Sequence, residues 1–548
     1  MTNATTGSER VVPGQRQPAR GQATLLTRLI QPVRTHWQFS VVLLAALVAR
    51  IVVVLGYPPV FWFSDSYNYV YDAVTHIPDA VRPNGYPFLL DLLLPLHSDY
   101  AISLLQAAMG LGVGVAIYAL LRHRGLPWWG ASLPTLPVLF DSYELHLEHL
   151  IAADTLFMFL VTVAVVMLCW SDRPSVLAMG VAGLLIGYAT LVRSVGEPLL
   201  AVVFVAMLVR WVGWRRMAAL AIAGIVPIAA YMVWFHGSYG KYALSDSSGA
   251  FLYSRVSTFA ECSSMKLPAS LEFLCDSTKP EYRPVAAEYI WADYELQPYQ
   301  NTRTPVYTKL GSDTAKRFTP GVNHDMRDFA EQAIEAQPVA YASAVANDIL
   351  HTFGWSRQPD PNNYYGNGPN FSFVTGAVLN ANVPWYATPV RLPGAPSNYC
   401  NGICLNKDNQ ARIIQSAERD FAGGQGLEGL GLTQAVRPWA RLLEIYQKVL
   451  YLRGTMFGII LLIGAAGVLA RWRRWGGIAL LPWLVGALLI VLPPMTSGFS
   501  YRYVLAAVPV TCLAAGLVFA RSPGQKSVRA LAADLRRHLG RGGTVNQE

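Results

Sequence analysis

The sequence predicts a mainly α-helical, polytopic membrane bundle of about ten spans, with about eleven to thirteen as the upper alternative, and a large mixed extracytoplasmic segment. The 548 residues are 53% hydrophobic and 14% charged, about half the charged fraction of a soluble domain. The mean hydropathy is +0.30. The 15 Trp and 27 Tyr suit the aromatic belts of a membrane interface. These values argue against a soluble globular protein.

The positions of the spans follow from length, because a bilayer core needs about 20 apolar residues per helix. The third and sixth apolar stretches are short enough to be re-entrant. The predicted spans are 39–58, 100–121, 127–140, 150–169, 175–192, 197–211, 217–235, 447–470, 476–494 and 500–520.

Basic residues fix the orientation. They gather in both tails and in the short loops around 122–124, 210–216 and 471–474, which places those parts in the cytoplasm. The net charge of +9 is therefore spread over loops and does not indicate nucleic-acid binding. We expect a multi-pass plasma-membrane protein with these parts: a cytoplasmic tail 1–37, a membrane module 38–235 with a first outer loop 59–99, an extracytoplasmic domain 236–446, membrane helices 447–520 and a basic cytoplasmic tail 521–548.

Four of the six cysteines lie in the outer segment, where disulfides persist. They are Cys262, Cys275, Cys400 and Cys404. Two local bridges, 262 to 275 and 400 to 404, are the simplest of the possible pairings. Free thiols are the alternative.

The first outer loop is the most informative stretch of the chain. An aromatic anchor, Phe61-Trp62-Phe63, is followed by Asp65, and Arg82-Pro83-Asn84-Gly85-Tyr86-Pro87 then turns the chain toward the second span. A carboxylate after such an anchor is held at the water interface. Motifs of nucleotide-binding enzymes, zinc proteases and serine hydrolases do not occur in the sequence. Extracytoplasmic chemistry by this chain would therefore need a substrate that arrives already activated.

Here the sequence resembles the polytopic GT-C-type glycosyltransferases that use polyprenyl-phosphate sugars, the superfamily of protein O-mannosyltransferases and lipid A aminoarabinose transferases. The likeness covers roughly residues 40–235 and 447–520. Besides the first outer loop, it rests on Thr190-Leu191-Val192-Arg193-Ser194, which ends an outward-going span, and on Phe499-Ser500-Tyr501-Arg502-Tyr503, which opens the last span.

The resemblance implies a GT-C-like fold with Asp65 as the catalytic base, and it makes 38–235 the catalytic module. Arg193 and Arg502, with Arg82 as a weaker candidate, would hold the donor phosphate. These roles require Asp65 to lie close to Arg193 and Arg502 on the extracytoplasmic side of the membrane.

A second acidic group follows the third span. If helical, Asp141, Glu144 and Glu148 share one face, and His146 and His149 nearby leave a divalent cation open, although a solvated helix start has the same pattern. Asp154 lies inside an apolar run, where a carboxylate is a functional candidate by default. We therefore expect Glu144, Glu148 and Asp154 to form an acceptor site or second acidic site. No metal is assigned and no other cofactor is expected.

The function that these observations favour is an inverting glycosyltransferase of the hexosyl or pentosyl type. It would move a sugar from a polyprenyl-phosphate donor to an extracytoplasmic glycan, lipid or protein, surrounded by membrane lipids and without nucleic acid. The alternative is a lipid or polysaccharide transporter or flippase without glycosyl-transfer chemistry. Transporters often carry paired repeats with broken helices, and no such repeat occurs in the sequence.

Overall fold

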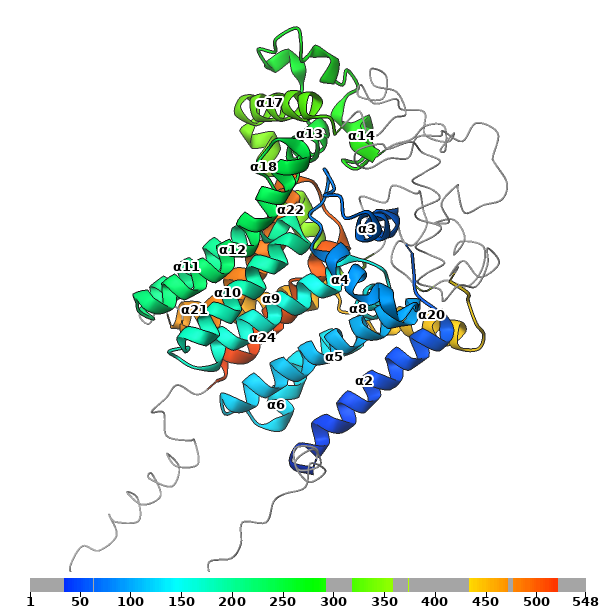
Figure 1. Ribbon diagram of the computed structural model, residues 1–548, viewed down its shortest axis with the longest axis vertical. Helices are drawn as coiled ribbons and strands as arrows, with labels where there is room; N and C mark the ends of the chain where they lie inside the picture. The colour runs from blue at the N-terminus through cyan, green and yellow to red at the C-terminus, as the bar shows by residue number, and fades with distance from the viewer. Residues whose placement is uncertain are drawn as a thin grey trace, which may run out of the picture.

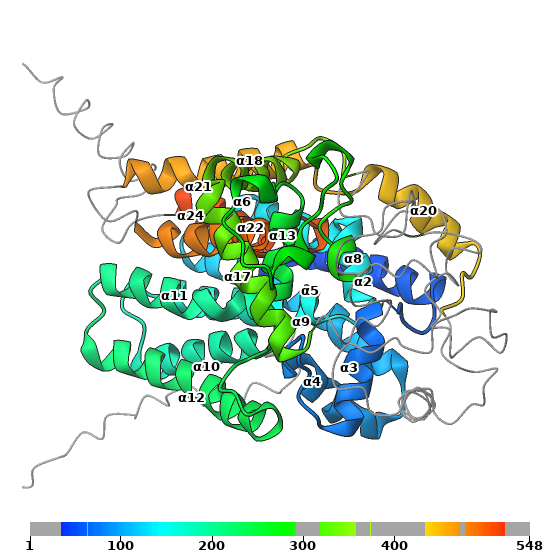
Figure 2. The same cartoon turned by 90° about the horizontal axis from the view of Figure 1, so that it is seen from above.

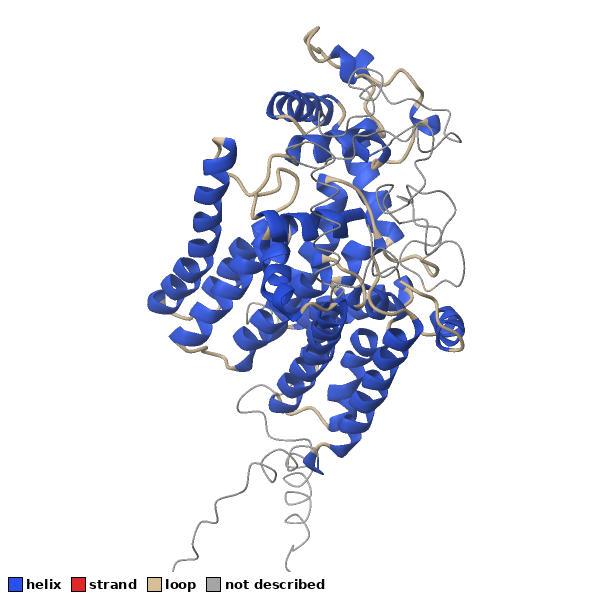
Figure 3. Cartoon of the chain, turned by 45° about the vertical axis from the view of Figure 1, so that its right-hand side comes forward, coloured by secondary structure: helices blue, strands red, loops and turns tan. Residues whose placement is uncertain are grey.

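A computed structural model describes residues 34–62, 64–291, 318–357, 373, 433–471 and 477–520. These residues form helices joined by loops and contain no strand, apart from one isolated parallel bridge between Phe61 and Leu150. Figure 1 shows a bundle of tilted helices with a smaller group of helices at one end, and Figure 3 shows the same helical character from another side.

The first half of the bundle contains long helices interrupted by short ones. Its elements are α2 Trp37–Gly56, α3 Ser64–Thr75, α4 Gly85–Leu93, η1 Leu94–Leu96, α5 Asp99–His123, α6 Trp128–Ser132, η2 Leu133–Thr135, α7 Leu136–Phe140, α8 Ser142–Glu148, α9 Ala153–Trp170, α10 Val176–Val192, η3 Ser194–Gly196, α11 Glu197–Val209 and α12 Trp214–Tyr239.

The remaining described elements belong to segment 236–446 and to the C-terminal helices. They are α13 Ser248–Ser257, η4 Cys262–Ser264, η5 Glu272–Leu274, η6 Pro280–Tyr282, α14 Glu288–Trp291, α17 Pro320–Ala336, α18 Pro338–His351, α20 Trp439–Val449, α21 Gly454–Ala470, η10 Gly477–Ala479, α22 Leu480–Thr496, α23 Tyr501–Leu505 and α24 Val508–Val518.

Six stretches in the described part of the chain are long and apolar enough to cross a membrane, and a seventh is α20 with α21 if this pair, bent by 55°, counts as one span. Three more apolar helices are shorter: Gly85–Leu96, Val176–Val192 and Ser194–Val209. Length and composition therefore do not establish the predicted count of about ten. The outward face of α2 exposes Val41, Leu44 and Val48, as expected of a helix in lipid.

The predicted span 127–140 is not one continuous helix. It consists of α6, η2 and α7, and η2 and α7 each carry a proline in their first turn, Pro134 and Pro137. Proline lacks an amide hydrogen and is favoured where a helix begins, so each one restarts the helix. The predicted span 500–520 is divided into α23 and α24, which together have the length and composition of one span. The other predicted spans coincide with helices to within a few residues, except that α21 begins later than expected.

Close approach of α10 to its neighbours organises one side of the bundle, where α10 packs against α9 and α12. A Cβ atom on Gly183 would lie 2.3 Å from the carbonyl oxygen of Leu220, so a larger residue would push α10 and α12 apart. On the other side, α24 packs against α21 and α22. Viewed from above, these two groups lie side by side (Figure 2).

The helices α13, α14, α17 and α18 form a unit that we call the cap, at the end of the bundle that also carries α3 (Figure 1). Its own core contains Tyr253 and Phe329, and Arg255 of α13 pairs with Asp348 of α18 at 2.7 Å. The described parts of segment 236–446 contain no strand, so the expectation of a mixed segment is wrong for these parts.

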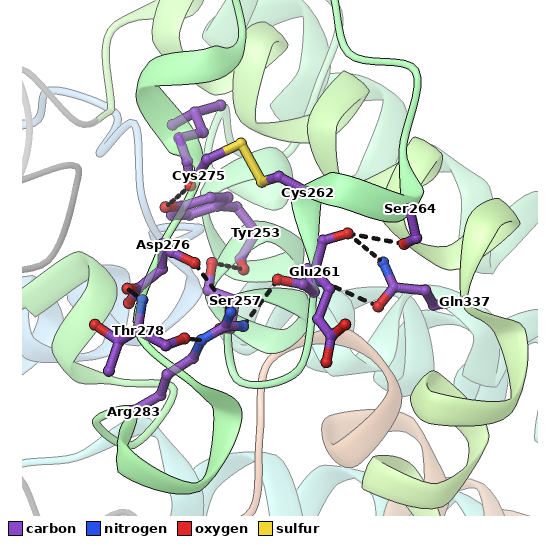
Figure 4. Close-up of a disulfide and its surroundings, with 12 residues drawn as sticks. Tyr253, Ser257, Glu261, Cys262, Ser264, Cys275, Asp276, Thr278, Arg283 and Gln337 are labelled. Atoms are coloured by element: carbon purple, nitrogen blue, oxygen red, sulfur yellow. Dashed lines mark hydrogen bonds between the residues drawn. A yellow bond between two sulfur atoms is a disulfide. The ribbon is translucent and has the colours of Figure 1, made fainter.

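A disulfide joins Cys262 and Cys275 within the cap, with a Cα–Cα distance of 6.0 Å. Beside it, the Arg283 guanidinium donates to the carbonyl oxygens of Ser257 and Thr278 (Figure 4). Covalent and charged links thus hold together a loop that has little helix of its own. Cys400 and Cys404 lie outside the described residues.

Candidate active site

The start of α3 is fixed by backbone hydrogen bonds to the segment that precedes α9. The Phe61 amide donates to the His149 carbonyl at 2.7 Å, and the Ile151 amide donates to the Phe61 carbonyl at 3.0 Å. The Ser66 hydroxyl adds a bond of 2.7 Å to the Ile151 carbonyl. Two helices therefore begin side by side, and the second residue of each is an aspartate: Asp65 in α3 and Asp154 in α9.

Asp65 is almost fully buried, with 6% of its surface exposed, and two guanidinium groups contact it. Arg82 Nη2 lies 2.8 Å from Oδ1. Both Nη atoms of Arg502 lie 3.2 Å from Oδ2. The carboxylate is thus bonded from both sides by cations that come from the loop after α3 and from the start of α23.

Asp154 extends the same cluster. It forms an ion pair with Arg193, the residue that caps the C-terminus of α10. Its Oδ2 also lies 3.6 Å from Arg502 Nε. We call Asp65, Arg82, Asp154, Arg193 and Arg502 the convergent cluster. Three arginines and two aspartates give it a formal net charge of +1, so it has one positive charge left for an anion.

A glycine allows the loop that carries Arg82 to reach the end of α10. Gly85 begins α4, and a Cβ atom there would lie 2.5 Å from the backbone of Leu191. The Tyr188 hydroxyl donates to the Gly85 carbonyl at 2.8 Å. The segment Gly85-Tyr86-Pro87, singled out in the sequence, therefore brings Arg82 and Arg193 into the same region.

The electrostatics of Asp65 depend on two opposing effects. Burial alone raises the pKa of this carboxyl, but the positive charges of Arg82, Arg502 and Arg193 outweigh burial and hold the pKa below its ordinary value. For Arg82 burial is the largest effect and lowers the pKa, but Asp65, Tyr69 and Asp79 together outweigh it, so that the pKa of Arg82 lies above the ordinary range. Both groups are therefore charged at neutral pH.

Two tyrosines complete the cluster, and the sequence analysis gave them no role. The Tyr503 ring lies 5.0 Å from the guanidinium carbon of Arg193 and 5.5 Å from that of Arg502, within the range of cation–π attraction. Tyr69 lies one helical turn after Asp65, with its ring centroid 5.1 Å from that of Tyr86. The position of Tyr503 next to Arg502 was a usable signal, as was the i, i+4 spacing of Asp65 and Tyr69.

Gln106 of α5 connects several elements around the site, and the sequence analysis gave it no role. Its Nε2 donates to the carbonyls of Glu148 and Leu150 at 2.9 and 2.8 Å, and its Oε1 accepts from the Tyr86 hydroxyl at 2.8 Å. One amide thus connects α5 and α4 to the segment that precedes α9. An uncharged polar residue within an apolar span was the only sequence signal.

The expected second acidic site is divided. Asp154 belongs to the convergent cluster, whereas Glu148 pairs with Arg50 of α2 at 2.6 Å, an ion pair between two buried side chains. Glu144 is buried, and its Oε1 has no hydrogen-bond partner among the described residues. Glu144, Glu148 and Asp154 therefore do not form one site.

Asp141 acts as the cap of α8 rather than as a ligand. It accepts from the Tyr143 amide at 2.8 Å and pairs with Arg357 of segment 236–446 at 2.9 Å. His146 and His149 pack against the Phe61 ring, with centroids 4.5 and 5.2 Å away. No group of three or more His, Cys, Asp or Glu side chains suited to a metal ion occurs in the described part of the chain.

Comparisons with known proteins give distant similarity. No family model and no curated protein matches the chain. The S. cerevisiae protein O-mannosyltransferase Pmt1-Pmt2 complex bound to the sugar donor is 17% identical over 42% of this chain and 37% of its own, with a TM-score of 0.29. The archaeal oligosaccharyltransferase AglB from Archaeoglobus fulgidus, in complex with an inhibitory peptide and a dolichol-phosphate, is 12% identical over 94% and 53%, with a TM-score of 0.35.

The chain thus spans about half the length, or less, of the two solved proteins that it matches. Both are named as glycosyl-transferring enzymes. At these TM-scores the similarity assigns neither a fold family nor a role to any residue.

Proposed function

We propose that this chain is a membrane-embedded inverting glycosyltransferase of GT-C type that transfers a sugar from a polyprenyl-phosphate donor to an extracytoplasmic acceptor. The observation that carries the proposal is the convergence of Asp65 with Arg82, Arg193 and Arg502, four residues from distant parts of the sequence. Their side chains supply one base and three cations, which is the set that this reaction needs.

The arginines act on the leaving group. A polyprenyl-phosphate sugar is a phosphodiester, and breaking its anomeric C–O bond leaves a second negative charge on the lipid phosphate. Guanidinium groups bind phosphate oxygens in a bidentate manner and stay charged. The surplus positive charge of the convergent cluster favours such an anion, and stabilisation that grows as charge develops lowers the barrier.

Asp65 acts on the acceptor. The acceptor oxygen attacks the anomeric carbon, its proton passes to Asp65, and the electron pair of the broken bond leaves with the phosphate. A single displacement of this kind inverts the anomeric centre. When the phosphate takes over the hydrogen bonds of Arg82 and Arg502, the carboxylate is freed and becomes more basic. Positioned general-base catalysis contributes roughly 10² to 10⁴ in rate.

The organisation of the chain follows from the same proposal. Asp65, Arg82, Asp154 and Arg193 come from module 38–235, but Arg502 comes from helices 447–520, so the catalytic unit includes both. The disulfide between Cys262 and Cys275 favours an oxidising compartment for the cap. Because the cap and α3 lie at the same end of the bundle (Figure 1), the active site would be on the extracytoplasmic face of the plasma membrane.

The decisive experiment uses the purified full chain in lipid nanodiscs with polyprenyl-phosphate mannose, arabinose and glucose. We expect turnover of one donor, detected as free polyprenyl phosphate by mass spectrometry, and a loss of about 10² or more in Asp65→Asn with donor binding retained. Asp328→Asn, a change at a partly exposed carboxylate of α17, is the matched control. A protein that moves a lipid cargo across the bilayer but turns over no donor, with Asp65→Asn as active as wild type, would be a transporter.

A further inference from the structure

The buried face of α3 continues beyond Asp65 with more polar side chains. Asn68 and Asp72 follow Asp65 at intervals of three and seven residues, which keeps all three on one side of the helix. Asn68 is 7% exposed and Asp72 is 8% exposed. Ser66, which bonds to the Ile151 carbonyl, points to a different side of the same helix. The three side chains therefore line a strip about 10 Å long, two turns of α3.

Asp79, in the loop after α3, is also almost fully buried, with 4% of its surface exposed. Its Oδ1 accepts from the Val81 amide at 2.9 Å, but its Oδ2 is buried without a hydrogen-bond partner among the described residues. The pKa of Asp72 lies well above its ordinary value, first because Asp72 is buried and second because the negative charge of Asp79 acts on it. Geometry places Asp79 on the same side of α3, because its carboxylate is bonded to the amide that precedes Arg82, and the Arg82 guanidinium reaches Asp65 on that face at 2.8 Å.

Asn68 contributes an unmatched donor. Its Nδ2 is buried and has no hydrogen-bond partner in the described part of the chain. Buried polar groups are nearly always bonded, and each exception calls for an explanation. One buried donor, Asn68 Nδ2, and one buried acceptor, Asp79 Oδ2, therefore have no hydrogen-bond partner among the described residues, and both residues are more than nine-tenths buried. A bound molecule that both donates and accepts hydrogen bonds would satisfy the two atoms together.

The chemistry of the strip favours a carbohydrate. A carboxyl group accepts hydrogen bonds and, when protonated, also donates one, whereas the amide nitrogen of Asn only donates them. Neighbouring hydroxyl groups on a sugar ring do both at once, and each hydroxyl is a donor and an acceptor. A serine or threonine side chain of a peptide offers a single hydroxyl. A metal ion is a poorer match, since the described residues contain no group of three ligand-type side chains and an amide N–H repels a cation.

We propose that Asn68, Asp72 and Asp79 form an acceptor subsite that binds the hydroxyl groups of a glycan, next to the sugar whose hydroxyl group Asp65 activates. This inference rests on the proposed function and narrows it, because the acceptor becomes a carbohydrate chain rather than a protein side chain. Asn68 and Asp72 lie on the same helix as the proposed base, Asp65. A sugar bound by them would therefore place a hydroxyl group of the adjoining sugar against Asp65.

The test uses the full chain in nanodiscs with two probes, a linear mannose trisaccharide and a linear arabinose trisaccharide, and with a Ser/Thr-rich peptide as the competing acceptor class. Asp72→Asn, Asp79→Asn and Asn68→Ala are compared with Asp91→Asn, the same change at a partly exposed carboxylate of α4. We expect the acceptor KM to rise about tenfold or more in the three variants, while donor hydrolysis without acceptor stays within about twofold of wild type.

Direct binding of the trisaccharides to donor-free protein is measured in parallel by saturation-transfer NMR. Binding by wild type and by Asp91→Asn, with loss in Asp79→Asn, supports the inference even if no donor in the panel is turned over, a result that would count against the proposed function alone. Absence of trisaccharide binding by wild type overturns the inference. Transfer to the peptide alone, or an unchanged acceptor KM in all three variants, overturns it too and leaves the glycosyltransferase intact.

Discussion

Arg502 donates to Asp65 across 437 positions of the sequence, with both of its Nη atoms 3.2 Å from the same carboxylate oxygen. Its Nε also lies 3.6 Å from Asp154. One guanidinium therefore contacts both acids of the convergent cluster, and the last described helices are needed to complete a site that begins in loop 59–99. Arg502 is accordingly the most informative cation to change.

Replacing Arg502 by lysine keeps the positive charge but removes the planar fork that contacts two carboxylates. We expect kcat/KM for the donor to fall about tenfold to a hundredfold, measured as initial rates of polyprenyl-phosphate release. The control is Arg441→Lys, at an exposed arginine of α20 that pairs with Glu444 at 2.6 Å. Equal rates for Arg502→Lys and wild type would exclude a role for the guanidinium geometry.

Replacing Arg82 by glutamine changes the pH dependence of transfer. Arg82 is among the charges that hold the pKa of Asp65 below its ordinary value against the opposing effect of burial. Without it the pKa of Asp65 rises. Because the base works only when ionised, the acidic limb of the rate against pH moves to higher pH. The measurement is kcat/KM over the acidic range, and an unmoved limb in Arg82→Gln would contradict the proposed electrostatic link.

Asp79→Asn has opposite effects on stability and on acceptor binding. Burial raises the pKa of Asp79 to about 6, above the value of about 3.9 for an unfolded chain. The folded state therefore binds the proton more tightly, and wild type loses stability as pH rises from about 4 through about 6. Asn keeps an oxygen for the Val81 amide and has no charge to bury.

We expect Asp79→Asn to be more stable than wild type by roughly 1 to 3 kcal/mol at about pH 8, and to lose this advantage at about pH 4. Thermal unfolding in nanodiscs at both pH values checks this. A stability difference that does not depend on pH would mean that Asp79 is not protonated in the way its burial implies.

Gln106→Met removes a buried amide but keeps its length. The Tyr86 hydroxyl and the carbonyls of Glu148 and Leu150 lose their partner, and unsatisfied buried groups cost about 1 to 3 kcal/mol each. We expect a lower Tm together with a lower kcat, because the start of α9 is less firmly held. Gln332→Met, at a partly exposed glutamine of α17, should leave both unchanged. A stable Gln106→Met protein with full kcat would show that the connection is dispensable.

Removal of the disulfide tests the independence of the cap. Cys262 and Cys275 are 13 positions apart, and closing a loop of about this size stabilises a fold by about 3 kcal/mol. The double change to serine should lower the Tm of the cap and make it easier to cleave by protease. Because Asp65 and its arginines lie outside the cap, kcat should stay within about twofold of wild type. A large loss of kcat would instead link the cap to the chemistry.

The helices were predictable because each long apolar run determines its own helix. The runs behind α2, α5, α9 and α12 have the length that lipid requires, and no tertiary contact is needed to locate them. The stretch 127–140 shows the limit of this reasoning, since apolar composition suggested a span while Pro134 and Pro137 divide it. Hydropathy averages over a window and does not register a missing backbone donor.

The convergent cluster was predictable only in part. A family resemblance pointed to Asp65, Arg193 and Arg502, and the structure brings them together. Asp154 was grouped with Glu144 and Glu148, which are closer in sequence, and it instead pairs with Arg193. Gln106, Asn68 and Asp79 carried no motif at all. Their importance comes from burial beside particular partners, and a single sequence does not reveal which polar side chains lose contact with water.

The backbone pairing of Phe61 with residues 149–151 has a mechanical consequence. Asp65 and Asp154 lie at the starts of two helices that these backbone hydrogen bonds hold together. Arg82, Arg193 and Arg502 belong to three separate elements. If donor binding in the proposed reaction shifts the side chains of the site, we expect the two acids to keep their spacing and the three guanidinium groups to move relative to them.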